Sequence, residues 1–231
     1  MARSVVYDFH LHTVLSDGDL LPTELIRRCI VNGYGALALA DHCGLGTMAR
    51  VLAEASQDCA LVRRHWQFEA YPAVELTHVP VGAVAELAAE AKALGAALVV
   101  VHGESPVEPV DPGTNLAAAT CRDVDILAHP GLITPETAKA AREHGVFIEV
   151  TSRQGHGMAN GHVVGVCLAA GAAMVVDSDC HAPKDILTPG WAEHVARCAG
   201  VPEDLLEGVL IENPLAVLAR ARENTARVGS P

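Results

Sequence analysis

Residues 5–13, Val-Val-Tyr-Asp-Phe-His-Leu-His-Thr, join a short apolar run to a His-x-His motif. An apolar run of this length, followed directly by polar residues, is typical of a buried strand. Alternate residues of a strand point to the same side, so His10 and His12 are expected to face one common site. The segment therefore predicts a strand whose carboxyl end carries two metal-binding side chains.

Six further apolar runs have the same character as residues 5–9, and helical segments lie between them. The runs cover residues 36–40, 68–74, 97–101, 124–128, 146–150 and 174–176. The predicted helical segments cover residues 21–32, 81–94, 135–144, 163–170 and 203–222, the last in two pieces divided at Asn213-Pro214. Strands that alternate with helices predict a parallel sheet.

Seven such units favour a closed or distorted barrel over an open sheet. We therefore expect an α/β fold, a distorted seven-stranded β/α barrel that is TIM-like, with a site at its carboxyl-terminal mouth. The length of 231 residues suits a single domain, expected over residues 1–222. Residues 223–231 are expected to form a frayed tail.

The composition fits such a barrel and limits its partners. Half of the residues are hydrophobic and only 3% are aromatic, as expected for short helices packed on a buried parallel sheet. The formal net charge of −12 repels phosphate backbones at long range, so extended nucleic acid is not expected as a partner. A metal cluster reverses the field inside one pocket, which keeps a small phosphorylated substrate compatible with this charge.

The cysteines and the apolar stretches predict a cellular location. The seven cysteines are odd in number and form no C-x-x-C pair, which indicates reduced thiols. The N-terminal residues lack the pattern of a signal peptide, and no apolar stretch approaches the ~20 residues that span a bilayer. We therefore expect a cytoplasmic protein without a membrane partner, while its oligomeric state is left open.

A histidine or a carboxylate follows six of the seven apolar runs. The carboxyl ends of parallel strands converge on one face of a barrel, where active sites form. A lone buried histidine is more often a hydrogen-bonded core residue, but repetition at six strand ends indicates ligation. The candidate ligands are His10, His12, Asp17, His42, Glu75, His102, His129, Asp179 and His181.

This set of side chains predicts the kind and number of metal ions. Neutral imidazole combined with carboxylate suits zinc, manganese or iron better than magnesium alone. Nine donors exceed what one ion uses, whereas two or three ions with three or four protein ligands each would use them. The sequence therefore predicts two to three divalent ions.

The motifs, taken in their order, resemble those of the PHP family, named for polymerase and histidinol phosphatase. The matching stretches are Asp8-Phe-His-Leu-His-Thr13, Ser16-Asp-Gly18, Ala40-Asp-His42, Val74-Glu-Leu76, Val101-His-Gly103, Ala128-His-Pro-Gly131 and Asp179-Cys-His181. The resemblance implies a distorted seven-stranded barrel that hydrolyses phosphoesters. Because no polymerase domain fits into 231 residues, the chain resembles the free-standing members.

The resemblance also implies a trinuclear site. One metal takes His10, His12, Glu75 and Asp179. A second takes His102 and His129 together with Glu75, which bridges the two ions. A third takes Asp17, His42 and His181.

A phosphate-binding cation is expected after the run at residues 146–150. Arg153 follows this run, with Ser152 and His156 nearby, and a guanidinium is a natural fork for phosphate oxygens; the alternative is an arginine in a surface loop. Lys184 is a further candidate for substrate binding, and His78 either faces the pocket or caps a helix. The loop at residues 103–115 has the composition of a lid or specificity element.

These observations predict metal-dependent hydrolysis of a small phosphate ester by an activated water, with Glu75, Arg153 and Asp179 as catalytic residues. The substrate is a phosphomonoester, such as histidinol phosphate or a nucleotide phosphate, or a small phosphodiester. One alternative is a metal-dependent amidohydrolase or deacylase on a similar barrel. Another is a non-catalytic barrel subunit of a nucleic-acid-processing complex, which the complete ligand set and the acidic charge disfavour.

Overall fold

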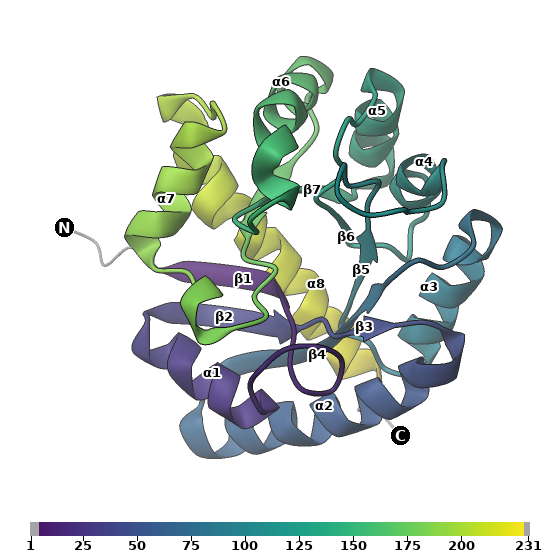
Figure 1. Ribbon diagram of the computed structural model, residues 1–231. Coiled ribbons are helices and arrows are strands. Elements are labelled where there is room, and N and C mark those ends of the chain that lie inside the picture. Colours follow the sequence, from purple (N-terminus) through teal and green to yellow (C-terminus); the bar gives the residue numbers. More distant parts are fainter. Residues whose placement is uncertain (1–4, 229–231) are drawn as a thin grey trace.

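A nearly closed barrel of parallel strands forms the centre of the computed structural model, which describes residues 5–228 (Figure 1). Neighbouring strands pair in the order β1, β2, β4, β5, β6, β7, β8, and every pair is parallel. They are β1 (Val6–Leu11), β2 (Tyr34–Leu39), β4 (Glu69–Leu76), β5 (Leu98–His102), β6 (Ile126–Ala128), β7 (Phe147–Thr151) and β8 (Met174–Asp177). The two-residue strand β3 (His42–Cys43) pairs with β4 beside this path. The predicted fold is confirmed, and each predicted apolar run overlaps one strand.

Helices surround the barrel (Figure 1). They are α1 (Pro22–Val31), α2 (Leu45–Trp66), α3 (Val84–Ala93), α4 (Thr114–Ala119), α5 (Pro135–His144), α6 (Asn160–Ala170), α7 (Pro189–Cys198) and α8 (Asn213–Val228). The predicted helix at residues 135–144 coincides with α5, which Thr134 caps by accepting the backbone N–H of Thr137. None of the helices in the described residues is long and apolar enough to cross a membrane.

Helix α8 lies across the amino-terminal ends of the strands and closes that end of the barrel (Figure 1). Val217 and Leu218 pack there against small and apolar residues of the barrel interior. Asn224 donates a hydrogen bond to the backbone carbonyl of Ala97, just before β5. The helix therefore continues to Val228, whereas the sequence predicts fraying from residue 223; residues 229–231 lie outside the described part.

Side chains complete the barrel between β1 and β8, where the backbone forms one isolated bridge, Leu11 to Cys180. The Asp177 carboxylate accepts the backbone N–H of Phe9 at 2.7 Å, and the Asp8 carboxylate accepts that of Ser178 at 3.1 Å. Both acids are fully buried, and burial raises the pKa of Asp8 to about 6. This reciprocal pair fixes the two strands whose ends carry the first and last ligand motifs.

Candidate metal centre

Five buried side chains from four strand ends converge at the mouth of the barrel. The Glu75 carboxylate lies 3.3 Å from His10 Nε2, 3.7 Å from His12 Nε2 and 3.7 Å from His129 Nε2. The Asp179 carboxylate lies 3.2 Å from His12 Nε2 and 3.6 Å from His129 Nε2. Two carboxylates thus stand among three histidines, which is the donor chemistry of a transition-metal site.

A second group lies beside the first and shares His12 with it. One donor atom each from His12, Asp17, His42 and His181 lies within 4.8 Å of the others. Asp17 is 3.3 Å from His181 Nε2 and 3.7 Å from His42 Nε2. His42 Nδ1 also approaches Glu75 at 2.5 Å, which links this group to the central carboxylate.

Asp41 holds the loop that carries Asp17, a role that the sequence did not predict. Its carboxylate accepts the backbone N–H groups of Thr13 and Ser16 and both of their hydroxyls. Gly18 completes the turn, because a Cβ there would lie 2.4 Å from the backbone oxygen of His12. The exposed Asp17 is therefore presented by a loop that buried hydrogen bonds hold in place.

A third group contains one histidine that the sequence places among the substrate-binding residues. Donor atoms of His102, His129 and His156 lie within 4.8 Å of one another. The rings of His129 and His156 are stacked, with their centroids 4.3 Å apart. The structure therefore brings all nine candidate ligands to the mouth and adds His156 to them.

Most of these histidines are oriented by a hydrogen bond at Nδ1. The partners are Glu149 for His10 (2.6 Å), Thr77 for His42 (2.6 Å), the Gly103 carbonyl for His102 (3.1 Å), Ser105 for His156 (2.6 Å) and the Asp179 carbonyl for His181 (2.9 Å). A carboxylate or carbonyl can only accept, so Nδ1 carries the proton in His10, His102 and His181. When the ring is neutral, Nε2 then faces the mouth with a free lone pair, as in histidines that bind metals.

Several buried donor atoms at the mouth have no hydrogen-bond partner among the described residues. They are His10 Nε2, both ring nitrogens of His12, Glu75 Oε1, His129 Nδ1 and Asp179 Oδ1. Leaving a buried polar atom unpaired costs on the order of 1–3 kcal/mol, and native proteins contain few such atoms. Divalent cations fit these atoms, because all of them except His129 Nδ1 belong to the converging donor groups described above.

Neighbouring charges set the protonation of the centre. Burial opposes a charge on His10, but the carboxylates of Glu149 and Glu75 outweigh it and hold the pKa of His10 well above its ordinary value. Burial, together with the charges of adjacent histidines, holds the pKa of His12 well below the ordinary value of a histidine. Burial also opposes ionisation of Glu75, yet the surrounding histidines, His10 first, hold its pKa well below its usual range. The central carboxylate is therefore ionised, as metal ligation requires.

Backbone strain is concentrated at this site. His78, His129 and Asp179 have φ angles of 51°, 27° and 50°, and they are three of the four non-glycine residues with positive φ between residues 5 and 228. Such conformations cost on the order of 1–3 kcal/mol each and cluster at ligand sites. The strain is consistent with side chains that are held for binding.

Glu149 contacts a candidate ligand directly, at 2.6 Å from His10 Nδ1, although the ligand prediction omits it. Glu149→Gln is expected to lower metal affinity or activity roughly 10–100-fold, the usual effect of changing the partner of a ligating histidine. The amide keeps a hydrogen bond to His10 but loses the charge that supports it. Chelator competition measures the affinity; an unchanged dissociation constant would show that Glu149 has no such role.

Of the expected substrate-binding residues, Arg153 lies at the mouth of the barrel, whereas Ser152 and Lys184 form no hydrogen bond or ion pair with the metal centre in the described part of the chain. Arg153 lies at the mouth, with Nε 4.0 Å from Asp179 and Nη1 3.2 Å from Asp185. The Ser152 hydroxyl instead donates to the backbone carbonyl of Ser178. Lys184 is exposed on a short turn, and no hydrogen bond or ion pair in the described chain joins it to the centre.

His78 faces the mouth, which decides between its two predicted positions. Its Nε2 lies 2.9 Å from the Glu108 carboxylate, and its ring centroid is 5.1 Å from that of His102. The short helix after it begins behind Pro80 and receives no side-chain cap. Glu108, in the loop at residues 103–115, was not among the predicted site residues.

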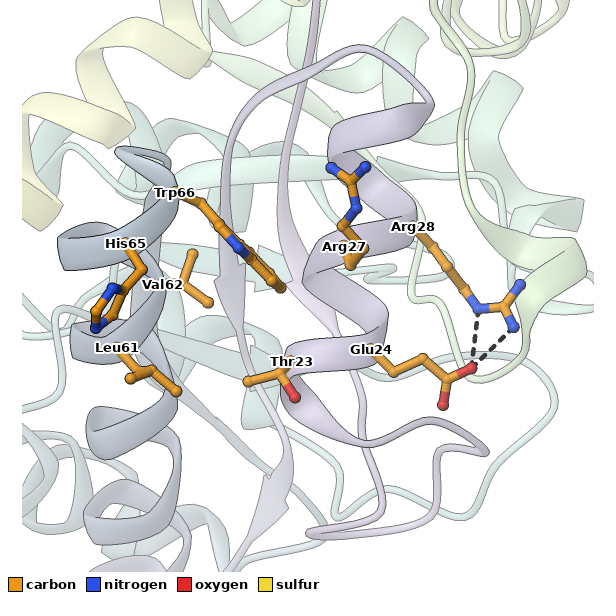
Figure 2. Close-up of a pocket in the computed structure, with 8 residues that line it drawn as sticks. All are labelled: Thr23, Glu24, Arg27, Arg28, Leu61, Val62, His65 and Trp66. Atoms are coloured by element: carbon orange, nitrogen blue, oxygen red, sulfur yellow. Dashed lines mark hydrogen bonds and ion pairs between the residues drawn. The ribbon is translucent and has the colours of Figure 1, made fainter.

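A groove of about 720 Å³ lies outside the barrel, between α1 and α2 (Figure 2). It is lined by Thr23, Glu24, Arg27, Arg28, Leu61, Val62, His65 and Trp66. Its Arg28 is paired with Glu24 at 2.8 Å, as the dashed lines in Figure 2 show. None of the candidate ligands lines this groove, so the metal centre is a separate feature.

The chain is similar in sequence to one full-length protein and to short parts of others. No protein-family model matches it. It is 40% identical over 215 residues to the uncharacterized protein MJ1295 of Methanocaldococcus jannaschii, which covers 93% of this chain and 99% of that protein. A stretch of 39 residues is 46% identical to the 5′-3′ exoribonuclease Rnm of Escherichia coli, covering 17% of this chain and 13% of that enzyme.

Solved structures share the barrel at low identity. The A. niger ochratoxinase superposes with a TM-score of 0.57 at 13% identity, over 92% of this chain and 71% of that one. An amidohydrolase of Burkholderia ambifaria, with bound zinc, superposes with a TM-score of 0.54 at 14% identity, over 92% and 75% of the two chains. At this identity the likeness concerns the fold.

Proposed function

We propose that this member of the family of protein MJ1295 from Methanocaldococcus jannaschii is a PHP-type metal-dependent phosphoesterase. Its substrate in this proposal is a small phosphate ester. The observation that carries the proposal is the set of buried donor atoms without a hydrogen-bond partner on His10, His12, Glu75 and Asp179 at the barrel mouth. Such a set is costly in a binding module without metal, but it suits a hydrolase that holds two or three ions.

The residues of the chain have separate roles in this proposal. When bound, divalent ions would supply Lewis acidity toward the phosphoryl group and an activated water. Glu75 contributes the central negative charge, and Asp179 is a second carboxylate beside His12 and His129. Arg153, whose Nε lies 4.0 Å from Asp179 and whose Nη1 pairs with Asp185, would bind phosphoryl oxygens of the substrate.

Two further observations support phosphate rather than an acyl group as the target. The local similarity to 5′-3′ exoribonucleases, enzymes that cleave phosphodiester bonds, covers a short stretch of this chain. An arginine stands at the mouth beside the carboxylates. The net charge of −12 favours a small substrate over a long polynucleotide.

A substrate profile of the metal-loaded protein tests the proposal. We expect hydrolysis of p-nitrophenyl phosphate, bis-p-nitrophenyl phosphate or short nucleotides, and no comparable turnover of p-nitrophenyl acetate or N-acyl amino acids. Glu75→Gln protein, purified in parallel, controls for contaminating phosphatases. Turnover confined to acyl substrates would instead identify an amidohydrolase and overturn the proposal.

Arg153→Ala is expected to lower kcat/KM for a phosphate ester roughly 10–150-fold, because hydrogen bonds to charged groups contribute about 1.5–3 kcal/mol. The metal content should stay unchanged, since Arg153 offers no ligand atom. Arg122→Ala, which removes an exposed guanidinium just before β6, is the matched control. Equal kcat/KM for wild type and Arg153→Ala would remove Arg153 from the site.

A further inference from the structure

We propose that Glu108 and His156 are metal ligands beside His102 and His129: His156 groups with both of these histidines, and Glu108 lies against His102 and His156. The inference rests on the proposed function. It also extends that function, because the resemblance to the PHP family implies neither Glu108 nor His156 as a ligand. It is carried by the geometry of two segments that meet over the mouth, the loop at residues 103–115 and the turn at residues 153–159.

The loop holds Glu108 at a defined position. Glu104, at its start, accepts the backbone N–H groups of Gly113 and Asn115, at 3.1 Å and 2.9 Å. The Asn115 side-chain oxygen accepts the backbone N–H of Glu104, and its amide nitrogen donates to the carbonyl of Pro130. The base of the loop is therefore closed by its own hydrogen bonds, and its tip extends over the histidines.

Histidines surround the carboxylate at this tip. Glu108 lies 2.9 Å from His78 Nε2, 3.1 Å from His102 Nε2 and 3.4 Å from His156 Nε2. Neither a lysine nor an arginine of the described residues pairs with it at ion-pair distance. A carboxylate that meets ring nitrogens on three sides has the environment of a metal ligand.

His156 has the same arrangement as the histidines at the strand ends. It is buried, and Ser105 lies 2.6 Å from its Nδ1. Gly155, with a φ of +93°, turns the chain so that the ring stacks on His129. One ring nitrogen each of His102, His129 and His156 then lies within 4.8 Å of the others.

The four proposed ligands differ from one another in their exposure to solvent. His102, His129 and His156 are buried, whereas Glu108 is partly exposed on a loop. Glu108 is therefore the ligand that an incoming phosphoryl oxygen most readily replaces. The competing role is recognition of a positively charged group of the substrate, in which case Glu108 would affect KM and leave metal binding unchanged.

Zinc binding by the full-length protein separates these roles. Wild type, Glu108→Gln and His156→Gln are loaded with Zn²⁺, freed of unbound metal and measured by elemental analysis and chelator competition. Exposed residues provide matched controls, Glu90→Gln and His144→Gln. Far-UV circular dichroism checks the fold of each variant.

We expect each of the two site variants to lose one equivalent of zinc, or to bind that equivalent with an affinity reduced by more than about 100-fold. This loss exceeds the roughly 10–100-fold effect of changing a residue that only hydrogen-bonds to a ligand. The other equivalents and both controls should match wild type. Ser105→Ala, which removes only the partner of His156, should weaken the same equivalent roughly 10–100-fold, and it serves as the second variant if His156→Gln fails to fold.

Wild-type zinc content and affinity in both Glu108→Gln and His156→Gln would overturn the inference. A raised KM with unchanged zinc in Glu108→Gln would also overturn it and assign Glu108 to the substrate. Fewer than two equivalents in the wild type, after loading, would instead contradict the proposed function itself.

Discussion

Glu75→Gln is expected to lose bound metal and at least about 10³-fold of the proposed phosphoesterase activity while the barrel stays folded. A bound ion contributes several kcal/mol to transition-state stabilisation, and each 1.36 kcal/mol is a factor of ten. Glu75 is fully buried and lies within 3.7 Å of His10, His12 and His129, so its charge acts on every neighbouring donor. A glutamine of nearly the same shape cannot offset the repulsion between two cations.

Elemental analysis and circular dichroism distinguish this role from a structural one. If Glu75 were only a hydrogen-bonded residue at a strand end, the amide would keep most of the activity. Glu90→Gln, a change of the same kind on the exposed face of α3, is the control. Full metal content together with near-wild-type turnover in Glu75→Gln would refute the central role of this carboxylate.

Removal of metal is expected to lower the melting temperature by roughly 8–16 °C at neutral pH for each tightly bound ion that is lost. An ion present at a thousandfold excess over its dissociation constant stabilises the folded state by about 4 kcal/mol. For a domain of this size, each kcal/mol shifts the melting temperature by about 2–4 °C. Without metal, the buried donors at the mouth that lack a hydrogen-bond partner destabilise the folded chain.

The size of this shift should depend on pH in a defined direction. The carboxylates around His10 hold its pKa in the folded protein above the value in the unfolded chain. Protonation of His10 therefore stabilises the metal-free protein at low pH. This stabilisation is lost as the pH rises through the raised pKa. Metal needs the unprotonated Nε2, so the metal-dependent shift should grow as the pH rises and shrink as it falls. Thermal melts with and without chelator between pH 5 and 9 test this, and a shift independent of pH would contradict it.

The strands and the mouth of the barrel could be predicted from the sequence because their signals are local. An apolar run followed by a polar residue marks a buried strand and its end wherever it occurs. The spacing in His10-Leu-His12 places both rings on one side, and the structure keeps them there despite an irregular register in β1. Helix α2 has no counterpart among the predicted helices, although its buried positions recur at helical spacing.

Contacts between distant segments were decided only by the tertiary structure. Glu149 meets His10 across 139 residues, and Glu108 meets His78 across 30, so no spacing in the chain relates these partners. Carboxylates such as Asp8 and Asp177 look like ordinary strand residues until closure of the barrel buries them at its seam. The sequence determined which side chains stand at the strand ends, because strand periodicity is a property of neighbouring residues. Closure of the barrel determined what surrounds those side chains, because burial and charge depend on every segment that packs against them.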